Sequence, residues 1–101
     1  MGIAEVRKND FLSIEKSVIN YLEKKINLLV MIGSIDMFAN STFDNKETKE
    51  FYNFLMNSMC EIEMLYFMKG EEYTHHEEVV ELVIEFQKKL NKYAHIIKEQ
   101  E

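Results

Sequence analysis

The sequence predicts an all-α protein of three long antiparallel helices, arranged as an up-down-up helical bundle. Proline is absent and only three glycines occur among 101 residues, so the chain lacks the residues that β-hairpins and tight loops require. Apolar residues make up 47% of the chain, which is ample for one buried core. They recur at intervals of three and four residues, the spacing of helices that bury one face.

The first helix is expected over about 10–39, after a flexible N-terminal arm at 1–9 that shows no apolar periodicity. Asn9 or Asp10 can cap this helix, and Asn40-Ser41-Thr42 end it. Its predicted buried stripe contains Ile14, Val18, Tyr21, Leu22, Leu28, Leu29, Ile32 and Ile35. With the two helices that follow, it forms a single helical-bundle domain over 10–101.

The second helix is expected over about 45–69. Asp44 and Glu47 have the spacing of a reciprocal N-terminal cap, and Lys69-Gly70 is a typical helix end. Its predicted buried stripe contains Phe51, Tyr52, Leu55, Met59, Ile62, Leu65 and Tyr66. Because the predicted links between helices are short, neighbouring helices must run antiparallel.

The third helix is expected over about 75–99. Thr74 and Glu77 match the Ser/Thr-x-x-Glu capping box, which satisfies two backbone N–H groups at a helix start. Its apolar residues follow alternating spacings of four and three, as in a coiled-coil seam. They are Val79, Val83, Phe86, Leu90, Tyr93 and Ile97.

Composition and charge exclude several classes of function. The net charge of −6 argues against direct nucleic-acid binding, which needs clustered Lys and Arg. The richest apolar run, 26–39, is interrupted by polar residues and is shorter than the roughly 20 residues that cross a bilayer, so we expect no membrane partner. The start of the sequence lacks the pattern of a secretory signal, and we expect a cytoplasmic protein. We expect the lone Cys60 to be a buried, inert thiol.

Two helices carry apolar residues on faces that begin polar. In the second helix, the outer line of Asn53, Asn57 and Glu61 continues into Met64 and Met68. In the first helix, the corresponding line ends in Met31 and Phe38. Three helices cannot cover each other's outer faces, so we expect self-association into a homo-oligomer through these four apolar residues. A groove for a foreign protein, or the covering of the bundle ends, would also explain them.

Acidic residues crowd the start of the third helix and the turn before it. They are Glu71, Glu72, Glu77, Glu78, Glu81 and Glu85. The cluster complements the positive end of the helix dipole and forms a solvated face. It also offers an acidic patch for docking a cationic protein partner.

Residues of possible chemical use gather at the same turn. Glu72 and His75 have the Glu-x-x-His spacing of di-iron bundles, with Glu78 three residues further on. Such bundles use two of these motifs inside helices, however, and this chain has one, at a turn. Aromatic and His side chains there could hold a nucleotide, and the candidates are Tyr66, Tyr73, His75 and His76.

The sequence shows no catalytic motif: there is no nucleophile elbow and no phosphate-binding glycine loop. We therefore expect a non-enzymatic protein without a cofactor, which acts as a regulatory or inhibitory protein-interaction module. Small bacterial or phage accessory factors are of this kind. The alternative is a small-molecule or metal-binding bundle with its site at the turn between the second and third helices.

Overall fold

The computed structural model describes residues 3–70 and 74–98, and its elements are helical. Four α-helices follow one another as α1 (Ile3–Leu22), α2 (Leu28–Phe38), α3 (Lys49–Lys69) and α4 (Glu77–Lys98). A short π-helical segment, η1 (Ala39–Phe43), continues α2. The predicted all-α class is confirmed, whereas the predicted number of three helices is wrong.

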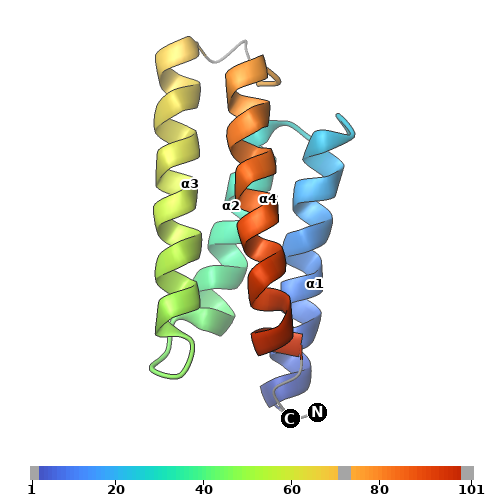
Figure 1. Ribbon diagram of the computed structural model, residues 1–101, viewed down its shortest axis with the longest axis vertical. Helices are drawn as coiled ribbons and strands as arrows, with labels where there is room; N and C mark the ends of the chain where they lie inside the picture. Colours follow the sequence, from blue (N-terminus) through green and yellow to red (C-terminus); the bar gives the residue numbers. More distant parts are fainter. Residues whose placement is uncertain (1–2, 71–73, 99–101) are drawn as a thin grey trace.

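The helices form an up-down-up-down bundle in which each helix packs against two others (Figure 1). α1 and α3 lie at opposite corners, and α2 and α4 each contact both of them. The bundle measures 41 × 23 × 20 Å, and helices of about twenty residues, which rise 1.5 Å per residue, account for about 30 Å of its length. Because successive helices are antiparallel, the α1–α2 and α3–α4 turns meet at one end of the bundle (Figure 1).

The expected helix over 10–39 breaks between Leu22 and Leu28. Lys24 adopts a left-handed conformation with φ of 63°. Its backbone N–H donates to the carbonyl of Tyr21 (2.9 Å), and that of Lys25 donates to the carbonyl of Asn20 (2.8 Å). This pair of bonds is the Schellman motif that closes a helix C-terminus, in which glycine normally takes the left-handed position. Lysine stands there in this chain, so the usual sequence signal for a helix end is missing.

Replacing Lys24 by glycine should therefore stabilise the protein by about 1 kcal/mol, since glycine adopts φ above zero without the steric cost of a Cβ. Lys24 is exposed, so the substitution removes little packing. Urea unfolding followed by circular dichroism measures the change. Lys25→Gly is the matched control, because Lys25 lies one residue further on and is not among the residues with positive φ. An equal gain in both variants, or none in Lys24→Gly, would contradict the assignment of strain to Lys24.

Helix starts also differ from the sequence expectations. The predicted arm at 1–9 is helical from Ile3 onward, and Arg7 within it makes an ion pair with Glu47 at 2.8 Å. The cap predicted for Asp44 and Glu47 is not formed. α3 begins later, with Thr48 as its N-cap residue. The Thr48 hydroxyl donates to the carbonyl of Phe43 (2.7 Å), so it closes the preceding loop instead of capping the helix.

One hydrophobic core runs the length of the bundle. It takes residues from all four helices and η1, and most of the predicted stripe positions are buried in it. Leu29, which was predicted to be buried, is instead nearly half exposed. The fully buried large side chains are Phe11, Ile14, Val18, Tyr21, Leu28, Met31, Ile35, Phe43, Leu55, Ile62 and Leu90. Within the described residues, no helix combines the length and the hydrophobicity that a bilayer crossing needs.

Candidate functional site

Helix α2 is apolar on its outer side as well as on its buried side. Its sequence, LLVMIGSIDMF, contains one charged residue, Asp36. Leu28, Met31, Ile32 and Ile35 face the core. On the outer side, Leu29, Val30 and Met37 are each about half exposed, and Gly33 between them is exposed too. A helix with apolar residues all round is usually buried all round, so this outer side is unusual for a surface.

The C-terminal half of α3 shows the same feature. Met64 is 62% exposed, Phe67 52% and Met68 81%. Earlier in the same helix, the outward positions are Asn53 and Asn57, and both are exposed. The predicted switch from polar to apolar along this outer line is therefore present in the folded chain.

The apolar parts of α2 and α3 adjoin each other across a groove. Ile32 and Asp36 line the groove from α2, and Met56, Met59, Cys60 and Glu63 line it from α3. The helical repeat places Phe67 one turn after Glu63 and Leu29 two turns before Asp36, so these two residues continue the walls. Val30, Met37, Met64 and Met68 follow on the outer sides. We call the six exposed residues Leu29, Val30, Met37, Met64, Phe67 and Met68 the α2–α3 face.

Two carboxylic acids lie inside the groove. The Oδ1 atom of Asp36 is buried and has no hydrogen-bond partner. Burial raises the pKa of Asp36, and the nearby Glu63 raises this pKa further. Of the described residues that line the groove, none is basic. The centre of the groove is thus a site of unbalanced negative charge between apolar walls.

The four residues predicted for an interface differ in their exposure to solvent. Met64 and Met68 are exposed on the α2–α3 face, and Phe38 is partly buried against the core. Met31 is fully buried, so its assignment to the surface was wrong. The reason is the break at Lys24, which changes the phase of α2 relative to α1. Cys60 was also predicted incorrectly, since it is an exposed free thiol at the groove.

The sequence reasoning missed Leu29, Val30, Met37 and Phe67, and it missed the groove. The signal that could have found Phe67 is its position three residues after Met64. The sequence alone could not show which side of the helix Leu29, Val30 and Met37 occupy. That side depends on where α2 begins, and the break before α2 was not predicted.

The turn before α4, proposed as a ligand site, is occupied by contacts within the chain. The Tyr21 hydroxyl donates to the carbonyl of Thr74, and Thr74 Oγ1 accepts from the backbone N–H of Leu28 at 2.8 Å. His75 Nε2 lies 2.8 Å from the carbonyl oxygen of Tyr21, and the two rings stack with centroids 4.4 Å apart. These contacts join the two turns at this end of the bundle. They give Thr74 and His75 a structural role.

The other candidates at this turn divide into engaged residues and residues outside the described part. Tyr66 is buried. His76 Nδ1 accepts from the backbone N–H of Glu78 at 3.1 Å, so His76 takes the capping position predicted for Thr74. Glu71, Glu72 and Tyr73 lie outside the described residues. Within 3–70 and 74–98, the structure brings together no group of three His, Cys, Asp or Glu side chains suited to a metal ion.

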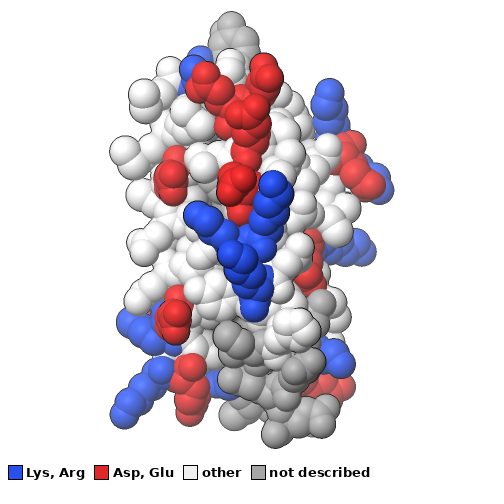
Figure 2. All heavy atoms as spheres, viewed as in Figure 1, with Lys and Arg blue, Asp and Glu red and all other residues white. Residues whose placement is uncertain are grey.

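The acidic patch is exposed where the structure describes it. Glu77, Glu78, Glu81 and Glu85 lie on the first half of α4, and Lys88, Lys89 and Lys92 follow on its second half (Figure 2). Lys69 lies 2.9 Å from Glu78, and its hydrogen bond and positive charge lower the pKa of that carboxyl. This order of charges complements the helix dipole.

Comparisons with protein-family models, with curated proteins and with solved structures find no match for this chain. The α2–α3 face therefore has to be interpreted from its own geometry and chemistry.

Proposed function

We propose that this protein is a non-enzymatic helical module that binds another protein through the α2–α3 face and acts in regulation or inhibition. The observation that supports this proposal is the exposure of six large apolar side chains on the adjacent helices α2 and α3 of a bundle that already has its own core. Contiguous apolar patches of about 300–600 Å² on single-domain proteins are often functional.

The chemistry of the face suits protein binding. Three of its six residues are methionines, whose flexible and polarisable side chains adapt to the shape of a partner. Burying apolar surface yields roughly 25 cal/mol per Å², so covering the face provides a substantial driving force for association. Homo-oligomerisation, expected from the sequence, is one form of such binding. The acidic half of α4 is a second surface that can steer a cationic partner.

Replacing Met64 and Met68 together by glutamate should abolish partner binding, because it places two charges where apolar surface would be buried. The measurement is native mass spectrometry of the tagged protein purified gently from its cells. We expect the wild-type chain of 12.1 kDa to carry an additional polypeptide mass, and the double variant to lack it.

The matched control is Asn53→Glu with Asn57→Glu. It adds the same two charges to the same helix at exposed positions outside the face. This control should retain the additional mass. A wild-type spectrum without any added polypeptide, or the same added mass in all three proteins, would contradict the proposed function.

A further inference from the structure

We infer that the groove between α2 and α3 receives a basic amphipathic helix of the partner, with a Lys or Arg of that helix placed between Asp36 and Glu63. This inference rests on the proposed function, in which the α2–α3 face binds a protein. It adds the chemical class of the bound segment.

The shape of the groove fits a helix. Its walls are two antiparallel helices, and a third helix packs along such a groove at a small crossing angle. α2 has 11 residues, which gives a wall about 16 Å long and a contact of about three helical turns. Gly33 leaves the middle of the outer side open, since a Cβ built there would meet nothing within 4 Å. A bound helix can therefore approach the α2 backbone closely.

Apolar residues are available along the groove to anchor such a helix. Leu29 and Phe67 lie toward one end, and Met56 lies further along the α3 wall. Residues spaced three and four apart on an incoming helix would meet these positions in successive turns. The carboxylates of Asp36 and Glu63 lie between them, so a cation is required at the middle of the incoming apolar stripe.

The charge inside the groove selects a basic helix. Asp36 Oδ1 is buried without a hydrogen-bond donor, and Glu63 is close enough to raise the pKa of Asp36. An ammonium or guanidinium group would donate to Asp36 and neutralise the repulsion between the two acids. The long alkyl stem of Lys or Arg would pack on Met56 and Met59, which line the same groove.

The groove between α3 and α4 provides a contrast within the same molecule. It also contains two carboxylic acids, Glu61 and Glu85, but Lys89 lines it with them. Lys88 lies 3.8 Å from Glu85 as well. The negative charge of that groove is compensated by the chain itself, whereas the charge at Asp36 and Glu63 is not.

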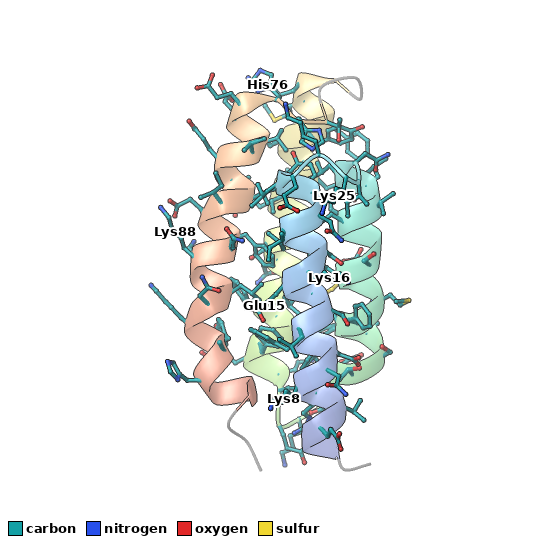
Figure 3. All side chains as sticks on the ribbon, turned by 90° about the vertical axis from the view of Figure 1, so that its right-hand side faces the viewer. Lys8, Glu15, Lys16, Lys25, His76 and Lys88 are labelled. Atoms are coloured by element: carbon teal, nitrogen blue, oxygen red, sulfur yellow. The ribbon has the colours of Figure 1, made fainter. Side chains whose placement is uncertain are left out.

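A second copy of this chain fits the groove less well. α2 contains no basic residue, and α3 carries lysines at its ends, Lys49 and Lys69. Two copies that met through the same face would place carboxylates opposite carboxylates, which is unfavourable. The exposed lysines Lys8 and Lys16 lie on α1, outside the α2–α3 face (Figure 3).

Two synthetic peptides test the inference. Both are helical, about four turns long, with the same leucine stripe at positions i, i+3, i+4 and i+7. One carries lysines beside the middle of the stripe, and the other carries glutamates at the same positions. Each is titrated into the isotope-labelled chain of 101 residues, and NMR shift changes report the affinity and the location of binding.

We expect the lysine peptide to bind with shifts on α2 and α3, and at least about tenfold more tightly than the glutamate peptide. In the Asp36→Asn, Glu63→Gln variant, this preference should disappear while the spectrum remains that of a folded chain. The control Glu61→Gln, Glu85→Gln changes the charge equally at the other groove and should retain the preference.

Three results would overturn the inference. They are equal or absent binding of both peptides, shifts confined to another surface, and concentration-dependent self-association of the free protein through α2 and α3. Failure of the peptides alone leaves the proposed function standing if native mass spectrometry still shows a partner that depends on Met64 and Met68. The absence of any added polypeptide in that spectrum would contradict both the inference and the proposed function.

Discussion

Replacing Phe51 by alanine should lower the free energy of unfolding by about 3–5 kcal/mol, because it deletes the centre of the largest aromatic cluster in the core. Phe51 is 3% exposed. Its ring centroid lies 4.8 Å from that of Phe43, 5.1 Å from Tyr93 and 5.6 Å from Phe11. These contacts join α1, η1, α3 and α4. The cavity left by the missing ring would therefore loosen the half of the bundle that contains η1 and the start of α3.

A loss of this size is a large part of the roughly 5–15 kcal/mol that stabilises a domain of this length. Guanidinium unfolding followed by circular dichroism measures it. Phe67→Ala is the matched control, since it makes the same chemical change on the same helix at a half-exposed position. That variant should change stability by no more than about 0.5 kcal/mol. Equal losses in the two variants would mean that the core is not organised around Phe51.

Truncating Tyr21 should destabilise the protein in two separable steps. Tyr21→Phe keeps the buried ring but removes the hydroxyl that donates to the Thr74 carbonyl, and should cost about 1–2 kcal/mol. Tyr21→Ala also removes the fully buried ring that stacks on His75, and should cost about 3–5 kcal/mol. Denaturant unfolding gives both values. Tyr52→Phe is the control, because its hydroxyl donates to the Asn40 side chain at an exposed site.

The Tyr21 hydroxyl should also give the protein a sensitivity to alkaline pH. Burial raises the pKa of Tyr21 to about 12, from 10.0 in the unfolded chain. Between these values the folded state holds more protons than the unfolded state, so stability falls as the pH rises above 10. Tyr21→Phe should flatten this decline. Burial, together with Glu50, raises the pKa of Tyr93 as well, and that contribution remains in both proteins. An unchanged decline in Tyr21→Phe would show that the Tyr21 phenol is not the group responsible.

The candidate site could be predicted in part from the sequence. Met64 and Met68 were recognised because α3 is one unbroken helix, so its outward line can be followed from Asn53 by counting turns. Leu29 was predicted in the core and Met31 on the surface, and the structure places them the other way round. The prediction counted helical turns across Lys24, where the first helix ends. The pairing of Asp36 with Glu63 was not predictable, since it depends on how two helices are rotated toward each other.

The sequence by itself determined the all-α class, the stripes of α3 and α4, and the apolar end of the α3 outer face. These features are local, because a helical period is encoded by residues three and four apart. The tertiary structure decided the fourth helix, the fully buried position of Met31 and the acidic groove. Lys24 carries no helix-ending signal of its own, and the break is held by contacts between distant residues, in which Thr74 bonds Leu28 and His75 stacks on Tyr21. Such contacts exist only once the two turns have met at one end of the bundle.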